Sequence, residues 1–148
     1  MTFREPHLDG ATAFGSDGAR TFAFFTSAGA FEVWSALTDH EQTTKYLYGM
    51  SLHSEWVPDA EIQVRVQDQV PLQGQVLCAW PHRRLSYFLH APDASPVYLT
   101  WLIRPHPSGA VCRLTIDEAE EGDGSVDLED VWLPILDALQ RHLASRPA

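Results

Sequence analysis

The middle of the chain, residues 52–117, constrains the fold most strongly, because apolar and polar side chains alternate there in short segments. Ile62, Val64 and Val66 alternate with polar residues, which is the period of a strand with one buried face. Arg65, on the other face, should therefore point to solvent. The same reasoning predicts strands over residues 52–56, 62–67, 73–78, 84–90, 97–104 and 110–117. Short turns join these segments, so neighbouring strands should pair antiparallel.

Two short helices are expected before this region. The aromatic segment 20–26 predicts a first strand, because aromatic residues favour strands. Ser27 follows it and can cap a first helix. Thr38 and Glu41 have the spacing of a capping box and predict the start of a second helix, which ends near residues 46–49.

The longest predicted helix lies at the C-terminal end of the chain. Its apolar stripe consists of Leu128, Val131, Trp132, Ile135, Leu136, Leu139 and Leu143. Ser125 is a candidate N-cap, and Pro134 should bend the helix or mark a break near Asp130. A sheet with one solvated face needs a cover on the other. This helix is the only predicted element that is long and apolar enough to be that cover.

The whole pattern fits one domain, because 148 residues are enough to bury a core. We expect an α+β fold: a curved antiparallel sheet of about six to seven strands, two short helices, and a long C-terminal helix packed across the sheet. The domain should span residues 19–145. Residues 1–18 are rich in Gly, Asp and Ala without periodicity and are expected to form a flexible N-terminal arm.

Composition disfavours several classes of function. The formal net charge of −10 argues against nucleic-acid binding and against anionic membrane surfaces. No apolar run approaches the roughly 18 to 20 residues that span a bilayer, and the N-terminus lacks the features of a signal peptide. A cytoplasmic protein is therefore expected. Cys78 and Cys112 lie inside predicted strands, which favours two reduced thiols in the core.

An ordered set of segments resembles a known superfamily. The set comprises residues 33–39 (VWSALTD), Trp56-x-Pro58, Gly74-x-Val76, residues 81–87 (PHRRLSY), residues 113–115 (RLT) and residues 132–139. It is similar to the helix-grip (SRPBCC, START-like) superfamily, within the branch related to the activator of the 90-kDa heat-shock protein ATPase. The resemblance covers residues 19–143. The chain departs from the pattern at Asp59-Ala60, where the family often has glycine, and at Pro134, where it usually has a helix former.

The resemblance implies a pocket between the sheet and the last helix. From the alternation of the strands, the expected lining consists of Tyr46, Trp56, Val64, Val76, Cys78, Tyr87, Leu99, Trp101, Leu114, Trp132 and Leu136. Tyrosine and tryptophan bury large areas and still offer a hydrogen bond. The alternative is a filled core without a ligand, and a register error of one residue would turn much of the set outward.

The sequence favours a binding protein over an enzyme. The first hypothesis is a small apolar or aromatic ligand, the second a polyketide cyclase or aromatase-like enzyme that uses the same cavity, and the third a chaperone accessory or other protein-interaction domain. His53 and Glu55 are the weak candidates for acid–base chemistry, because two residues apart on a strand share a face. The seven histidines show no metal-binding spacing, and no cofactor is expected. Exposed edge strands make a homodimer possible.

Overall fold

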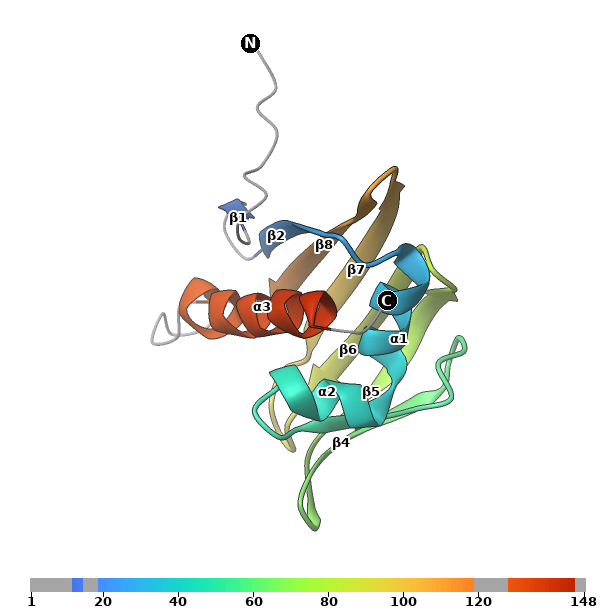
Figure 1. Cartoon of the computed structure of the whole chain (residues 1–148). Helices are drawn as coiled ribbons and strands as arrows, with labels where there is room; N and C mark the ends of the chain where they lie inside the picture. Colours follow the sequence, from blue (N-terminus) through green and yellow to red (C-terminus); the bar gives the residue numbers. More distant parts are fainter. Residues whose placement is uncertain (1–11, 15–18, 119–127, 146–148) are drawn as a thin grey trace.

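A computed structural model describes residues 12–14, 19–118 and 128–145. It contains one eight-stranded antiparallel sheet with the order β1-β2-β8-β7-β6-β5-β4-β3. The strands are β1 (Thr12–Phe14), β2 (Ala19–Thr26), β3 (Ser51–His53), β4 (Glu61–Val66), β5 (Gln69–Trp80), β6 (Arg84–His90), β7 (Val97–His106) and β8 (Gly109–Glu118). The helices are α1 (Ala30–Thr38), α2 (His40–Tyr46) and α3 (Leu128–Ala144). The predicted α+β architecture is confirmed (Figure 1).

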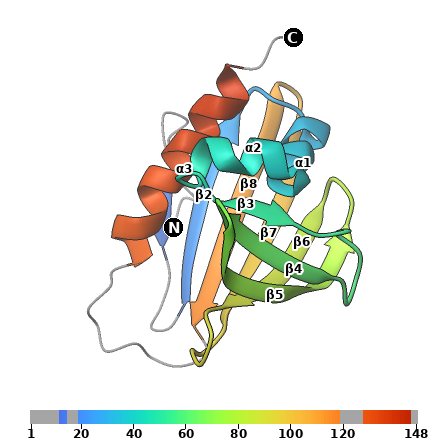
Figure 2. The same cartoon turned by 90° about the horizontal axis from the view of Figure 1, so that it is seen from below.

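The path of the chain explains the shape of the sheet. Strands β3 to β8 follow one another as neighbours, and β8 then pairs with β2. The connection from β2 to β3 carries α1 and α2 across the sheet, and all three helices lie on the same side of it (Figure 2). Seven strands, β2 to β8, make up the predicted sheet. The three residues of β1 add an eighth strand from within the segment expected to be an arm.

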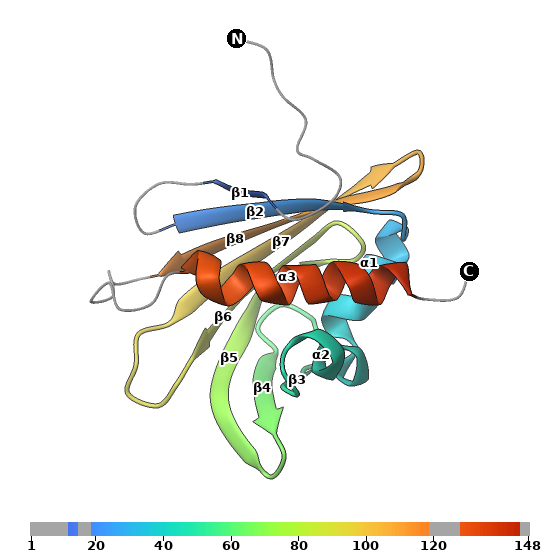
Figure 3. The ribbon, with the colours of Figure 1, turned by 60° about the vertical axis from the view of Figure 1, so that its left-hand side comes forward.

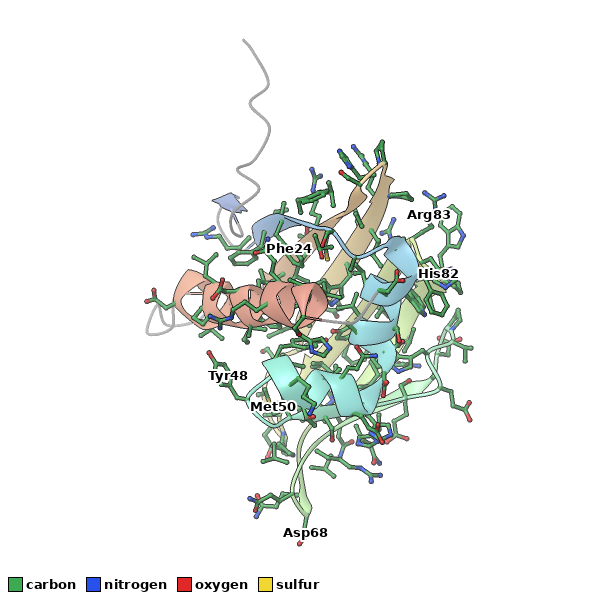
Figure 4. The ribbon with its side chains drawn as sticks, viewed as in Figure 1. Phe24, Tyr48, Met50, Asp68, His82 and Arg83 are labelled. Atoms are coloured by element: carbon green, nitrogen blue, oxygen red, sulfur yellow. The ribbon has the colours of Figure 1, made fainter. Side chains whose placement is uncertain are left out.

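Helix α3 covers the sheet through its apolar stripe. Ile135, Leu136 and Leu139 are buried, and α3 runs across the sheet between β2 on one side and β4 and β5 on the other (Figure 3). Figure 4 shows Phe24, a fully buried residue of β2, between that strand and α3. The helix continues through Pro134 without the break expected near Asp130, and Pro134 lies on its exposed side. The candidate cap Ser125 lies outside the described residues.

Two polar contacts hold α3 in place. The amide Nε2 of Gln140 donates to the carbonyl oxygen of Phe25 in β2, at 2.8 Å. Nε2 of His142 lies 3.0 Å from Oε1 of Gln42 in α2. These contacts attach the C-terminal half of α3 to two different elements. None of the helices in the described ranges is long and apolar enough to cross a membrane.

The helix caps differ from the sequence prediction. The N-cap of α1 is Gly29, which makes no side-chain cap, rather than Ser27. The second cap is displaced by one residue, because Thr38 still belongs to α1 and its hydroxyl donates to a carbonyl of that helix at 2.9 Å. Asp39 is the first residue with extended backbone, and its carboxylate accepts from the backbone N–H of Glu41 at 3.0 Å.

A bulge in β5 overturns the expectation for Cys78. The register with β6 shifts between Val76 and Cys78, so Leu77 is an extra residue in the strand and is exposed. A single extra residue turns every following side chain to the opposite face. Cys78 therefore pairs with Ser86, which faces away from the helices, and it does not line the interior. Both cysteines are free thiols.

Candidate functional site

The interior between the sheet and the helices contains the other residues expected to line a pocket. Eight of them are buried in the core: Tyr46, Val64, Val76, Tyr87, Leu99, Trp101, Leu114 and Leu136. The remaining two, Trp56 and Trp132, are half-buried and pack against this core. The strand register accounts for much of this set, because Val76, Tyr87 and Leu99 are directly opposed across β5, β6 and β7. Trp56 and Trp132 are thus the members of the set that reach solvent.

Three aromatic side chains with polar groups meet on the inner face of the sheet. Nε1 of Trp101 donates to the hydroxyl of Tyr87 at 3.1 Å, and this hydrogen bond is buried. The ring of Trp56 lies across that of Tyr87, with centroids 5.8 Å apart and an interplanar angle of 65°. The indole Nε1 of Trp56 is itself buried but has no hydrogen-bond partner among the described residues.

Trp56 reaches this position from a loop rather than from a strand. Strand β3 ends at His53, three residues before the end predicted from the sequence. The backbone N–H of Trp56 donates to the hydroxyl of Ser54 at 3.1 Å, and Trp56 has a φ of 54°. This left-handed conformation costs energy in a bulky residue. A conformation that costs energy indicates that the surroundings fix the direction of the indole.

Tyr46 already has a partner for its polar group. Its hydroxyl donates to the carbonyl oxygen of Ala36 at 2.8 Å, in the last turn of α1, where carbonyls lack a helical partner. Tyr46 therefore contributes only its ring to the interior surface. The hydroxyl stabilises the junction between α1 and α2.

The buried titratable groups of the interior are held in their neutral forms. Burial raises the pKa of Tyr87 to about 12, although the hydrogen bond from Trp101 acts in the opposite direction. Burial likewise raises the pKa of the Cys112 thiol to about 12. The pKa of Tyr46 lies well above its usual value because of burial and of the nearby Tyr87 and Cys112. This interior accordingly disfavours negative charge.

The acid–base candidates His53 and Glu55 do not form the expected pair. His53 alternates with the buried Leu52, so it lies on the outer face of β3, while Glu55 follows the end of the strand and is exposed. Nε2 of His53 is 2.8 Å from the hydroxyl of Ser51, and its ring stacks on His40 with centroids 4.4 Å apart. The pKa of His53 is lowered by partial desolvation, then by His40 and Arg65. Its surroundings are therefore those of a surface residue.

Arg65 is exposed, as its place in the alternation predicted. Its guanidinium donates to Oε1 of Gln63 at 2.9 Å. Within the described part of the chain, no three His, Cys, Asp or Glu side chains gather closely enough to hold a metal ion.

Some half-buried apolar residues on the inner face were missing from the predicted lining. Leu89 and Val97 oppose each other across β6 and β7, and both pack against the core, as does Leu72 of β5. Leu89 lies two residues from Tyr87, and Val97 lies two residues from Leu99, so the same alternation extended by one step would have included them.

The chain matches solved structures over most of its length. A protein from Rhodobacter sphaeroides is 18% identical, with a TM-score of 0.75, and the match covers 92% of this chain and 99% of that one. A protein from Mesorhizobium loti is 16% identical, with a TM-score of 0.77 and coverage of 88% and 99%. DynU16, described as a protein in the dynemicin biosynthetic locus, is 18% identical, with a TM-score of 0.75, but the match covers 88% of this chain and only 48% of DynU16.

These similarities establish the fold alone, because the sequence identities are too low to say anything about function. No curated protein matches the sequence with significance. The family model described as Activator of Hsp90 ATPase homolog 1-like protein matches residues 27–144, which is most of the chain. The resemblance deduced from the ordered segments is thereby confirmed, and the chain belongs to the family of Activator of Hsp90 ATPase homolog 1-like proteins.

Proposed function

We propose that the protein binds a small hydrophobic or aromatic molecule between the sheet and α3. The observation that carries this proposal is the meeting of Trp56, Tyr87 and Trp101 on the inner face of the sheet. Sites for small molecules combine apolar and aromatic surface with a few polar groups that fix orientation. Tyrosine and tryptophan supply both from one side chain.

The partial exposure of two aromatic residues supports the same proposal. Trp56 and Trp132 pack against the core but are not fully covered by the described part of the chain. Trp132 belongs to α3, and Trp56 precedes β4, so they approach the interior from opposite layers of the fold. We infer that a ligand enters beside one of them and then contacts Tyr87.

The structural relatives also support a role with small molecules. DynU16 is described as a protein in a biosynthetic locus, and such loci make small molecules. A shared fold by itself does not transfer a function. The proposal therefore depends on the aromatic residues of this chain, and the relatives only indicate which kind of ligand to test first.

A titration with neutral aromatic probes tests the proposal. Tetralin, naphthalene and diphenylmethane, each with a ketone analogue, can be titrated into the protein and followed by calorimetry and tryptophan fluorescence. We expect saturable binding of at least one probe at one site per chain, and we expect Trp56→Ala to weaken it. Trp80→Ala is the matched control, because Trp80 is 65% exposed and pairs with Arg84 on the outer face. Absence of saturable binding across all probes would contradict the proposal.

The other hypotheses for function gain no specific support. An enzyme of the cyclase or aromatase type would need a proton-transferring group beside its substrate, and His53 lies on the outer face of β3. A chaperone accessory, a homodimer and a cytoplasmic location remain predictions from the sequence.

A further inference from the structure

One buried hydrogen-bond donor of the interior has no acceptor among the described residues. Nε1 of Trp56 is inaccessible to solvent, and no described residue accepts its hydrogen. Buried donors almost always have a partner, because an unpaired one costs roughly 1–3 kcal/mol. Among the buried side-chain nitrogen and oxygen atoms of the described residues, this is the one atom without a partner. It therefore needs a specific explanation.

A second donor belongs to the side chain whose ring contacts that of Trp56. The hydroxyl of Tyr87 accepts a hydrogen bond from Trp101. This bond occupies one lone pair of the hydroxyl oxygen, and the hydroxyl hydrogen is still able to donate. Within the described ranges no acceptor for that hydrogen is found. The rings of Trp56 and Tyr87 are in contact, with centroids 5.8 Å apart. The indole N–H and the phenol O–H thus belong to neighbouring side chains that come from different elements.

We propose that the ligand of this interior is a neutral compound with a carbonyl oxygen, such as an aromatic ketone or a quinone, which accepts hydrogen bonds from Nε1 of Trp56 and the hydroxyl of Tyr87. This inference rests on the proposed binding function and specifies its ligand class. A carbonyl oxygen has two lone pairs, so one atom can accept from both donors. The hydrogen bond from Trp101 orients the Tyr87 hydroxyl for this purpose.

The absence of a buried cation among the described residues favours a neutral ligand. The buried polar side chains of the described residues are Thr26, Thr43 and Ser86, and none of them carries a charge. A carboxylate or phosphate placed beside Trp56 would be buried without a counter-charge, which is strongly unfavourable. A carbonyl oxygen needs no counter-charge. Two neutral donors suit it, and they discriminate it from a hydrocarbon of the same shape.

Pairs of probes that differ only in the carbonyl group test this inference. Suitable pairs are 1-tetralone with tetralin and benzophenone with diphenylmethane, titrated by calorimetry at pH 7. We expect each ketone that binds to do so about tenfold or more tightly than its hydrocarbon partner, because hydrocarbon binding leaves the donors unpaired. We expect Trp56→Phe, which keeps a ring but removes the N–H, to reduce that ratio severalfold and to leave only the part that the Tyr87 hydroxyl supplies. Using the ratio removes the effect of the smaller ring, since both members of a pair lose the same contacts.

Trp132→Phe is the matched control, because it alters another half-buried tryptophan of the interior. It should change both affinities together and preserve the ratio. An independent readout comes from ¹⁵N-labelled tryptophan, since the indole N–H signal that disappears in Trp56→Phe should move downfield on addition of the ketone. The signal of Trp80, on the outer face, should stay in place.

The outcomes separate this inference from the proposed function. Equal binding of ketone and hydrocarbon by the natural chain would overturn the carbonyl inference and leave the binding function intact. A preference for the ketone that is undiminished in Trp56→Phe would overturn the role assigned to the indole. Failure of every probe to bind would contradict both proposals. Ketone preference reduced in Trp56→Phe and unchanged in Trp132→Phe would support the inference.

Discussion

Replacing Tyr46 with phenylalanine should destabilise the protein through the loss of one hydrogen bond. Tyr46 is the last residue of α2, and its hydroxyl donates to the carbonyl oxygen of Ala36 at 2.8 Å. The side chain is only 3% exposed, so water cannot readily replace the hydroxyl. Removing it leaves a carbonyl in the last turn of α1 without its partner, which costs about 1–3 kcal/mol.

The measurement is the free energy of unfolding in urea, followed by circular dichroism at pH 7. The variant Tyr46→Phe should lower it by about 1–3 kcal/mol, with an unchanged dependence on urea concentration. The corresponding fall in Tm is roughly 2–4 °C for each kcal/mol in a chain of this size. Tyr48→Phe is a closely matched control, because Tyr48 lies two residues later and is 71% exposed. It should change stability by less than about 0.5 kcal/mol.

One result would refute this reasoning directly. If Tyr46→Phe and Tyr48→Phe have the same stability within about 0.5 kcal/mol, the buried hydroxyl does not hold α1 and α2 together. A loss in both variants would point instead to a general effect of tyrosine in this segment. A loss confined to Tyr46→Phe would assign the stabilisation to the hydrogen bond with Ala36.

Three other changes have expected outcomes that follow from the structure. Burial raises the pKa of Cys112 on folding from 9.0 to about 12, so the stability that its protonated thiol contributes is complete below pH 9 and is lost as the pH rises toward 12. The free energy of unfolding in urea should therefore fall between pH 8 and pH 11, and it should fall less steeply in Cys112→Val, by up to about 1.4 kcal/mol per pH unit. Gly74→Ala should destabilise by roughly 1–3 kcal/mol or more in the same assay, because its Cβ would lie 1.8 Å from the carbonyl oxygen of Phe88; an unchanged stability would contradict this close approach. Pro134→Ala should raise Tm and add up to about 3 kcal/mol, because Pro134 lies inside a continuous helix; a lower Tm would mean that the proline is needed there.

Alternation predicted the strands and their faces well, because side chains of a strand point to opposite faces in turn. It failed where an extra residue interrupts the ladder. Leu77 gives no sign in the sequence that it is a bulge, and the shift turned Cys78 to the outer face. Helix caps were displaced for a related reason: Thr38 and Asp39 are adjacent and both can cap, and only the backbone conformation decides between them.

Packing also outweighed one local signal. Pro134 predicted a bend or a break, since it lacks an N–H for the helical ladder, and the break does not occur. The burial of Ile135, Leu136 and Leu139 against the core contributes several kcal/mol, more than the cost of one missing hydrogen bond. Propensity is a local term, and the tertiary contacts that override it involve β2, which is distant in sequence.

The candidate site was predictable as a surface but not as a set of polar groups. Alternation showed which residues face the interior. It could not show that the hydroxyl of Tyr46 donates to the carbonyl oxygen of Ala36, or that Nε1 of Trp101 donates to the hydroxyl of Tyr87. Only the three-dimensional contacts reveal that no described residue accepts the indole N–H of Trp56.

Three buried titratable groups of the interior are poorly suited to proton transfer. A group that moves protons in a reaction needs a pKa near the working pH. The buried groups Tyr87 and Cys112 each have a pKa near 12, and that of Tyr46 is also raised, so all three keep their protons at neutral pH. His53, the histidine considered for acid–base chemistry, is on the outer face of β3. Tyr46, Tyr87 and Cys112 thus hold their protons too tightly to exchange them with a bound molecule at neutral pH, and the role proposed for the interior uses its neutral hydrogen-bond donors instead.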